Sequence, residues 1–389
     1  MKKINKKLLF SCPTVFLKRP IAEIISKMEN NNIGLLSPID IVEGPLKIHY
    51  NKINGINFHN YFTLQLPISS EWPIPLNPIK ILKILKKIRK YDVIHMWVPF
   101  YLSHVIIILL KQLLFRRKKL IITMDTFPGL SFETGLISNF LFWLFYNLVA
   151  KLFFKNVDYL VLYSNSFKKF ALDVGVEEEK IRILPTGVDT TLKNKSKNIR
   201  NEFTIDENDK VILFVGLLNH RKGVDIFIDV ADKLRNKKNL KFLIVGNGSD
   251  AKNYKEMVED KELTQRVIFT GYRNDVHNFY YASDILLFPS RGEGLSGVLM
   301  ESMSYGLPIV TSKIVGTVDL IDDNYNGFLC EINDIDCYVR KIRTLINKED
   351  IRKRFINNSY ERIEKYFNWK INIEKYKKFY KEIIIEDLK

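Results

Sequence analysis

The chain has 389 residues, of which 46% are hydrophobic and 27% charged, and its formal net charge is +16. This length favours two domains over one, and the composition excludes an intrinsically disordered chain. Cys12, Cys330 and Cys337 lack the paired spacing of a zinc site or a disulfide framework, so we expect ordinary thiols, no metal, and a cytoplasmic protein.

The chain opens with MKKINKKLLFSCPTVFLKRP, in which Pro13, Lys18 and Arg19 interrupt the apolar run. This pattern predicts a first buried strand rather than a signal peptide. Most of the excess positive charge lies before residue 190, which indicates an anionic partner. No nucleic-acid motif accompanies the charge, so we expect an anionic membrane and no nucleic acid.

Short apolar runs alternate with helical patterns along the whole chain. They lie at 6–12, 91–98, 118–124, 157–164 and 181–187, and then at 210–216, 240–246, 266–271, 284–290 and 306–312. Strands that alternate with helices predict parallel sheets, and therefore an α/β chain with two doubly wound domains. The Lys- and Asn-rich stretch 190–210 separates the two series, which gives domains 1–189 and 190–366 and a C-terminal helix, 367–389, that crosses back toward the N-terminal domain.

Two segments of the first half have patterns that suit a membrane surface. Residues 78–90, PIKILKILKKIRK, place Ile and Leu on one helical face and Lys elsewhere, as in a basic interfacial helix or a surface helix that covers its own sheet. Residues 136–154, LISNFLFWLFYNLVAKLFF, carry no charge before Lys151 and are borderline in length for a membrane span. We expect a buried or membrane-dipping helix there.

The stretch FVGLLNHRKGVDIFIDVADKL places a strand end at Gly216, and Arg221 and Lys222 just before Gly223 at the start of an amphipathic helix. Two cations beside helix-start amides predict a site for a diphosphate leaving group, with exposed loop cations as the alternative. The related stretch LKFLIVGNGSD lacks the third glycine of a dinucleotide fingerprint, because Ala251 occupies that position. We therefore expect a mononucleotide or its diphosphate at this strand end.

The stretch FPSRGEGLSGVLMES places Glu293 in a glycine-rich turn and Glu301 on a helix predicted to begin near Ser296 or Gly297. Free amides at the start of a helix bind anions, and a helix carboxylate can accept hydrogen bonds from ribose hydroxyls. The carboxylate in the turn can hold a sugar hydroxyl. The alternative is one glutamate that serves as a helix N-terminal charge and another on a solvated face.

These motifs, in this order, resemble the family 4 glycosyltransferases of the GT-B fold, most strongly from Ile181 to Glu382. The resemblance implies two Rossmann-like domains that face an interdomain cleft. It implies a retaining, metal-independent enzyme, without a cofactor, that moves a sugar from a nucleotide diphosphate sugar, UDP- or GDP-linked, to a glycan acceptor. With the basic front half, we expect a lipid-linked or surface glycan acceptor and a peripheral place on the cytosolic face of a membrane.

The resemblance also implies roles for individual residues. Asp125, Glu293 and Lys222 are the expected catalytic residues, and Asp125 would orient or deprotonate the acceptor. The donor would be bound by Gly216, Arg221, Lys222, Thr270, Gly271, Tyr272, Arg273, Glu293, Gly294, Leu295, Ser296, Gly297 and Glu301, and the acceptor side would include His95, Asp125, Lys18 and Arg19. No second carboxylate is placed as a nucleophile, so assistance by the leaving phosphate is the favoured route to retention.

Two departures from the family pattern keep other functions open. Leu217 stands where many members have Arg, and the glycine pair usual after the first strand is replaced by SCPTVFLKRP. A binding or partner subunit with impaired catalysis is therefore one alternative, and a sugar-nucleotide epimerase of the same fold is another.

Overall fold

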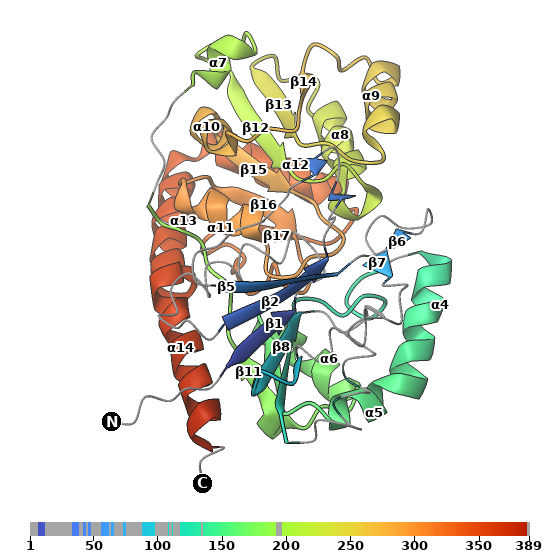
Figure 1. Cartoon of the computed structure of the whole chain (residues 1–389). Coiled ribbons are helices and arrows are strands. Elements are labelled where there is room, and N and C mark those ends of the chain that lie inside the picture. The colour runs from blue at the N-terminus through green and yellow to red at the C-terminus, as the bar shows by residue number, and fades with distance from the viewer. Residues whose placement is uncertain are drawn as a thin grey trace. The chain divides into compact units, whose positions relative to one another are not determined.

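The residues that the computed structural model describes divide between two compact units (Figure 1). Unit 1 comprises Met1–Phe127, Ile137–Thr186 and Asn372–Lys389, and unit 2 comprises Pro128–Leu136 and Gly187–Ile371. The described residues are 7–11, 33–38, 42–43, 46–47, 56–61, 64–65, 73–74, 88–97, 108, 111, 117–133, 135–191 and 197–386.

Within the described residues, unit 1 contains a parallel sheet of seven strands in the order β11-β10-β9-β8-β1-β2-β5. Its strands are β1 (Leu8–Ser11), β2 (Ile33–Pro38), β5 (Ile56–Tyr61), β8 (Val93–Trp97), β9 (Lys119–Met124), β10 (Tyr159–Leu162) and β11 (Ile181–Ile183). The order reverses between β1 and β8, as in doubly wound folds. Two short antiparallel pairs lie outside this sheet: β3 (Val42–Glu43) with β4 (Leu46–Lys47), and β6 (Leu64–Gln65) with β7 (Pro73–Ile74).

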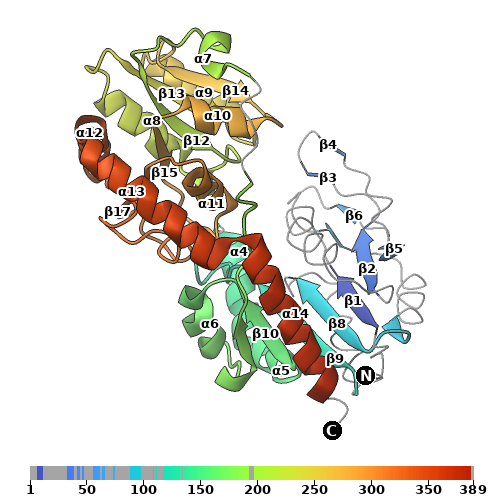
Figure 2. The same ribbon diagram turned by 90° about the vertical axis from the view of Figure 1, so that its left-hand side faces the viewer.

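The described helices of unit 1 follow β9 and β10, and the C-terminal helix joins them. They are α4 (Leu136–Leu144), the π-helix η1 (Phe145–Val149), α5 (Ala150–Lys155), η2 (Asn165–Phe167), α6 (Lys168–Asp173) and η3 (Glu178–Lys180). From Asn372 onward α14 (Trp369–Glu386) belongs to unit 1, where Figure 2 shows it beside β10 and β9. Its Tyr376 hydroxyl donates to the carbonyl of Leu184 at 2.7 Å, which holds the helix to the chain just after β11.

Unit 2 contains a parallel sheet of six strands, within the described residues, in the order β14-β13-β12-β15-β16-β17. The strands are β12 (Lys210–Val215), β13 (Leu240–Val245), β14 (Val267–Gly271), β15 (Ile285–Phe288), β16 (Ile309–Ser312) and β17 (Phe328–Cys330). Its helices are α7 (Ile199–Glu202), η4 (His220–Lys222), α8 (Val224–Lys233), α9 (Ala251–Asp260), α10 (Val276–Ala282), α11 (Gly297–Ser304), α12 (Ile335–Asn347), α13 (Glu349–Arg362) and the π-helix η5 (Ile363–Phe367).

The core of unit 2 explains why its strands were predictable. The side chains of β12 are buried on both faces of the sheet after Lys210, so the strand is a continuous apolar run. Phe214 packs against Phe227 of α8 with ring centroids 5.7 Å apart, and Phe227 packs against Phe242 of β13 at the same distance. The predicted α/β fold with two doubly wound parallel sheets is therefore confirmed.

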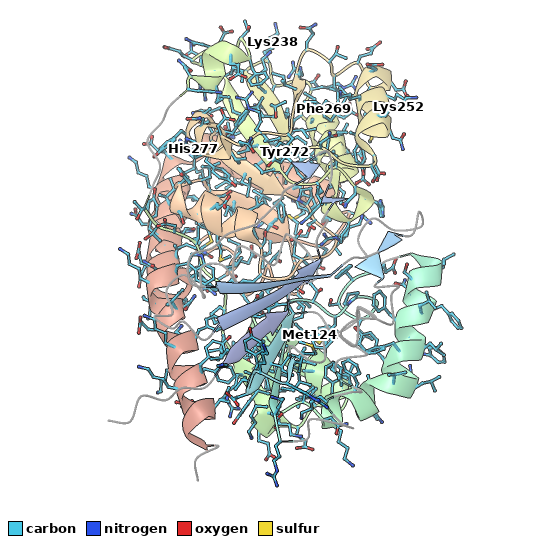
Figure 3. The ribbon with its side chains drawn as sticks, in the orientation of Figure 1. Met124, Lys238, Lys252, Phe269, Tyr272 and His277 are labelled. Carbon is cyan, nitrogen blue, oxygen red and sulfur yellow. A yellow bond between two sulfur atoms is a disulfide. The ribbon has the colours of Figure 1, made fainter. Side chains whose placement is uncertain are left out.

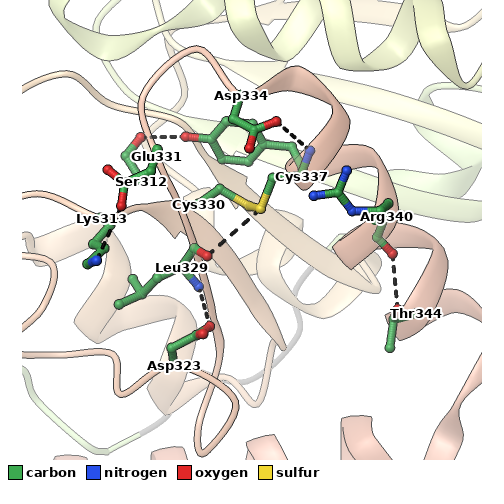
Figure 4. Close-up of a disulfide and its surroundings, with 11 residues drawn as sticks. Ser312, Lys313, Asp323, Leu329, Cys330, Glu331, Asp334, Cys337, Arg340 and Thr344 are labelled. Atoms are coloured by element: carbon green, nitrogen blue, oxygen red, sulfur yellow. Dashed lines mark hydrogen bonds and ion pairs between the residues drawn. A yellow bond between two sulfur atoms is a disulfide. The ribbon is translucent and has the colours of Figure 1, made fainter.

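The prediction of ordinary thiols is wrong for two of the three cysteines. Cys330, at the end of β17, and Cys337, in the first turn of α12, form a disulfide with their Cα atoms 5.8 Å apart (Figure 4). Asp334 explains the geometry, because its carboxylate accepts from the backbone N–H of Cys337 at 2.9 Å and caps α12 where the chain turns back over β17. Cys12 lies outside the described residues.

The two segments considered for a membrane surface are described to different extents. Residues 75–87 lie outside the described residues, and Ile88 is a buried helical residue. Residues 136–154 form α4, η1 and most of α5, with Phe142, Tyr146 and Ala150 buried in unit 1. Among the helices that the structure describes, none has both the length and the apolar character required to cross a membrane.

Candidate functional site

The strand order of unit 2 locates the site before any side chain is considered. β12 and β15 are neighbours at the point where the order of strands reverses. Ligands of doubly wound sheets bind beyond the carboxyl ends of the strands at such a point. The two loops that leave these ends are 216–223, after β12, and 289–296, after β15.

A single turn of 3-10 helix, η4, carries Arg221 and Lys222, the cations of the first loop. The side chain of Asn219 caps this turn by accepting from the backbone N–H of Lys222 at 3.2 Å. Gly223 then takes a left-handed conformation, with φ of 71°, and a Cβ at this position would lie 2.0 Å from the carbonyl oxygen of Pro289. Only glycine permits both the turn and this contact between the two loops.

The structure brings together two of the three predicted catalytic residues, Lys222 and Glu293. The Nζ atom of Lys222 lies 2.6 Å from Oε1 of Glu293, and the hydroxyl of Ser290 donates to the same oxygen at 2.6 Å. Glu293 is buried and Lys222 lies over the ring of Phe288, with Nζ 5.4 Å from the ring centroid. A carboxylate in this setting requires a charged partner and hydrogen bonds, and Lys222 and Ser290 supply them.

Arg221 lies against Phe132, a residue that no sequence motif predicted for the site. Its Nη1 atom donates to the carbonyl oxygen of Gly292 at 2.8 Å, and its guanidinium lies 5.4 Å from the ring centroid of Phe132. A Cβ on Gly292 would lie 2.5 Å from the Cβ and Cγ atoms of Phe132, so this ring covers the glycine. Phe132 belongs to the segment Pro128–Leu136, which joins unit 2 although it precedes the rest of that unit in sequence.

Arg291 fixes the glycine-rich turn to the start of α8, a role that sequence reasoning also missed. Its guanidinium donates to the two oxygens of Asp225 at 2.8 and 2.6 Å and to the carbonyl of His220 at 2.7 Å. Burial opposes ionisation of Asp225, but the hydrogen bonds and charge of Arg291 outweigh it and lower the pKa of Asp225. A further bond, to Oδ1 of Asn333 at 3.1 Å, links Arg291 to the turn between the two disulfide cysteines.

The predicted helix after the glycine turn is confirmed, since α11 begins at Gly297 and Ser296 is its N-cap. The Ser296 hydroxyl accepts from the backbone N–H of Leu299 at 3.4 Å. Glu301, on α11, accepts from the hydroxyl of Tyr280 at 3.0 Å. Burial raises the pKa of Tyr280, and the charge of Glu301 raises it further, so the tyrosine keeps its proton and donates a hydrogen bond to this carboxylate.

The two glycines of LKFLIVGNGSD are explained by contact between neighbouring loops. A Cβ on Gly246 would lie 1.8 Å from the carbonyl oxygen of Gly216, and one on Gly248 would lie 2.4 Å from that of Leu218. The backbone N–H of Leu218 donates to the carbonyl of Asn247 at 3.0 Å. These glycines therefore allow close packing behind the first loop, and an approach by a nucleotide here stays a prediction.

Four of the residues predicted to bind the donor, Thr270 to Arg273, lie at the end of β14, and they differ in their contacts. Thr270 donates to the carbonyl of Ile244 at 3.3 Å, and a Cβ on Gly271 would meet no heavy atom within 4 Å. Tyr272 is 52% exposed (Figure 3). Arg273 is engaged by two carboxylates, Glu202 at 2.6 Å and Asp275 at 2.8 Å, so its contacts are those of a residue that ties β14 to α7.

His95, which the resemblance placed on the acceptor side, lies in the middle of β8. It is fully buried; Nδ1 lies 2.6 Å from the hydroxyl of Tyr380, and Nε2 lies 2.7 Å from that of Thr123. Its ring stacks on Trp97 with centroids 4.0 Å apart, and burial holds the pKa of His95 well below its ordinary value. These are the contacts of a core residue of unit 1.

The remaining acceptor-side residues are placed in part. Asp125 follows β9 directly and is half-buried, and the hydroxyl of Thr126 donates to its Oδ1 atom at 3.4 Å. Lys18 and Arg19 lie outside the described residues. Among the side chains that the structure describes, no group of three or more His, Cys, Asp or Glu has the arrangement of a metal site.

Comparison of the chain with known proteins identifies its class as that of the glycosyltransferases. Residues 43–192 match the family model described as Glycosyltransferase Family 4, and residues 195–362 match the model described as Glycosyl transferases group 1. The chain belongs to the family 4 glycosyltransferases, which have the GT-B fold. The resemblance inferred from the sequence is therefore confirmed.

Relatives and solved structures agree with this assignment. The chain is 27% identical to an uncharacterized glycosyltransferase of Methanocaldococcus jannaschii over 374 residues, which cover 92% of both chains. It is 28% identical to the UDP-Gal:alpha-D-GlcNAc-diphosphoundecaprenol alpha-1,3-galactosyltransferase of Escherichia coli over 235 residues, 58% of this chain and 60% of that enzyme. The crystal structure of Anabaena HepE in complex with UDP and glucose matches with a TM-score of 0.78 at 17% identity, over 97% of this chain and 100% of that one.

Proposed function

We propose that the chain is a retaining glycosyltransferase that moves a hexosyl group from a nucleotide diphosphate sugar, UDP- or GDP-linked, to a lipid-linked glycan acceptor. Its place would be cell-surface polysaccharide or glycoprotein glycan synthesis, at the cytosolic face of a membrane. The single observation that carries the proposal is the Lys222–Glu293 pair, 2.6 Å apart at the switch point of unit 2. The acceptor named for the relative from Escherichia coli and the UDP bound to HepE support the choice of substrates.

In this proposal the residues of unit 2 supply the positive charge that the departing diphosphate requires. Lys222 and the amide N–H groups at the start of α11 would stabilise the leaving group, with Arg221 beside them. Glu293 would hold a hydroxyl of the donor sugar and Glu301 the ribose. The hydrogen bonds from Ser290 and Tyr280 support these roles, because each orients a carboxylate before any substrate binds.

The proposed reaction retains the anomeric configuration. The acceptor oxygen would attack the anomeric carbon on the face from which the diphosphate leaves, while the bond from that carbon to the phosphate oxygen breaks. The acceptor proton would pass to the leaving phosphate, and Asp125 would orient the acceptor hydroxyl, a role that rests on the family resemblance.

The experiment that tests the proposal measures release of nucleoside diphosphate. The full chain is incubated with UDP-, GDP- and ADP-sugars, with and without polyprenyl-diphosphate-linked acceptors in detergent micelles. We expect release that depends on acceptor for one donor and is lost in Lys222→Gln. A change in the configuration of the donor sugar in the absence of acceptor would instead indicate an epimerase. Nucleotide binding without release from any pair would indicate an impaired partner subunit.

A further inference from the structure

The outer face of the helix formed by α4, η1 and α5 exposes large apolar side chains. Trp143 is 57% exposed and Leu148 is 65% exposed. Among the described residues of this helix, the other exposed large apolar side chains are Leu136, Phe140, Leu141, Leu144 and Val149. Single exposed apolar residues are ordinary, but a continuous group on one helix marks a surface for a partner.

The opposite side of the same helix is anchored in unit 1, so the exposed side is a stable feature. Phe142, Tyr146 and Ala150 are buried, as are Phe153 and Phe154. On the exposed side the rings of Phe140 and Trp143 stack with centroids 6.0 Å apart. Asn147 donates one N–H of its side-chain amide to the carbonyl of Trp143 at 2.8 Å, within the helix.

Positive charge gathers at the C-terminal end of this helix. Lys151 and Lys155 are exposed residues of α5. Lys155 lines a hollow of about 450 Å³ at the amino ends of β9 and β10, together with Lys111, Lys119, Lys180 and Arg182. The hollow also contains two carboxylates, Asp158 and Glu179.

The pairing of these charges decides which cations can bind a ligand. Asp158 is used internally, because it accepts from the backbone N–H of Leu120 at 2.7 Å and from Lys111 at 3.2 Å. Arg182 lies over the ring of Tyr159, with its guanidinium 4.8 Å from the centroid, and Lys180 pairs with Glu177 at 3.0 Å. Lys155 is exposed and Lys180 and Arg182 are half-buried at the rim, and an exposed ion pair such as Lys180–Glu177 is weak in water, so these cations still offer positive charge to a ligand.

We propose that this surface, the exposed face of α4, η1 and α5 with the basic hollow at its end, docks on an anionic phospholipid bilayer. The apolar side chains enter the bilayer at the boundary between headgroups and acyl chains, and Lys155, Lys180 and Arg182 bind lipid phosphate. A second copy of this chain is a poorer partner, because it carries the same net charge of +16. A nucleic-acid duplex keeps its bases stacked inside and presents phosphates and groove edges, so it offers no aliphatic surface to match Leu148.

This inference deepens the proposed function, since a lipid-linked acceptor is presented at a bilayer. It is tested without donor or acceptor, so a negative result leaves the transfer reaction untouched, and a failure of transfer leaves the docking surface untouched. The full chain is floated with vesicles of phosphatidylcholine alone and of phosphatidylcholine with about one third phosphatidylglycerol. We expect binding to the mixed vesicles and roughly tenfold less to the neutral ones.

Variants separate the apolar contribution from the charge. The double variant Trp143→Ser and Leu148→Ser should lose flotation, and Lys155→Gln with Lys180→Gln should lose the preference for anionic vesicles. Leu172→Ser, which changes an exposed leucine of α6 in the same unit, is the matched control and should bind as the original chain does.

A direct readout is the fluorescence of Trp143, obtained as the difference from Trp143→Phe. Brominated acyl chains should quench it, because they touch only side chains that enter the bilayer. Flotation that is unchanged in the Trp143 and Leu148 variant, or absent in the original chain, would overturn the proposal. So would a dimer in lipid-free solution that the same variant disperses, since that would identify a second copy as the partner.

Discussion

At the scale of single residues, the contact between Lys222 and Glu293 gives the most direct test of the proposed function. Lys222→Gln removes the charge that we assign to the leaving diphosphate while keeping much of the length of the side chain. We expect kcat to fall by about 10² to 10³, the usual effect of removing one group that stabilises developing negative charge. The measurement is the rate of nucleoside diphosphate release at saturating donor and acceptor.

A control distinguishes this role from a general loss of charge on unit 2. Lys233, at the end of α8, forms an exposed ion pair with Asp336 at 3.1 Å, so Lys233→Gln should leave kcat unchanged. Circular dichroism of both variants should match the original chain. A Lys222→Gln variant with the original kcat would exclude Lys222 as the leaving-group cation.

Phe132 is predicted to act through Arg221 rather than on substrate. Phe132→Ala removes the ring that covers Gly292 and the guanidinium, and a contact of this kind contributes about 0.5 to 2 kcal/mol. We expect the KM for the donor to rise about threefold to thirtyfold with a smaller change in kcat, and Phe132→Tyr to restore it. Leu130→Ala, at an exposed position of the same segment, should have no effect. Equal KM values for Phe132→Ala and Leu130→Ala would contradict this role.

His95 makes the stability of unit 1 depend on pH. Burial lowers its pKa, so below its ordinary pKa of about 6.5 the unfolded chain binds a proton that the folded chain does not. The free energy of unfolding should therefore fall as pH drops below that value, by up to about 1.4 kcal/mol per pH unit. Urea unfolding at about pH 7.5 and about pH 5.5 measures the effect, and His95→Gln should reduce the difference. The same pH dependence in both proteins would assign it to other groups.

At the scale of elements, the predictions succeeded where a local pattern determines structure. β12 to β16 are apolar runs that end at Gly, Ser or a turn, and each lies within a predicted segment. β2 and β5 were missed, because IGLLSP and INFHNY mix apolar and polar residues and β5 contains His and Asn. β17, three residues long, gives no periodic signal.

The candidate site, too, was predictable only where local sequence patterns determine the structure. Lys222 and Glu293 belong to loops that follow predicted neighbouring strands, so the parallel sheet itself brings them to one edge. Phe132 and Gly292 are brought together by the path of a segment far away in sequence, and no local pattern encodes such a contact. The disulfide was missed for a related reason, since only the turn capped by Asp334 shows that Cys337 returns to Cys330.

The disulfide is predicted to stabilise the β17–α12 element and the site next to it. It joins residues seven positions apart, and the chain-entropy model gives about 2 kcal/mol for so short a loop. Reduction, or Cys330→Ala with Cys337→Ala, should lower the stability of unit 2 by that amount in urea unfolding. Because Asn333 lies in this loop and bonds to Arg291, amide exchange in 289–294 should also become faster. Unchanged exchange there would show that the loop and the glycine turn are independent.

At the scale of the whole molecule, the proposed chemistry divides between the two units. All the described residues that we assign to the donor belong to unit 2, whereas Asp125 and the docking surface belong to unit 1. The positive charge is divided in the same sense, since most of the excess precedes residue 190. We infer that unit 2 recognises the soluble nucleotide and that the front half meets the acceptor and the membrane.

This division predicts how a nucleoside diphosphate alone should affect the molecule. A ligand that binds only the folded state stabilises it by about 2.7 kcal/mol at a hundred times its Kd, and the effect falls on the elements that bind it. We expect UDP or GDP to slow amide exchange in 216–223 and 291–301 and to leave β10 and β11 unchanged. Exchange is measured by mass spectrometry on the full chain, with Lys222→Gln as the variant that should lose the protection. Protection confined to unit 1 would place the nucleotide in the other sheet and would refute the assignment of Lys222, Glu293 and Glu301 to the donor.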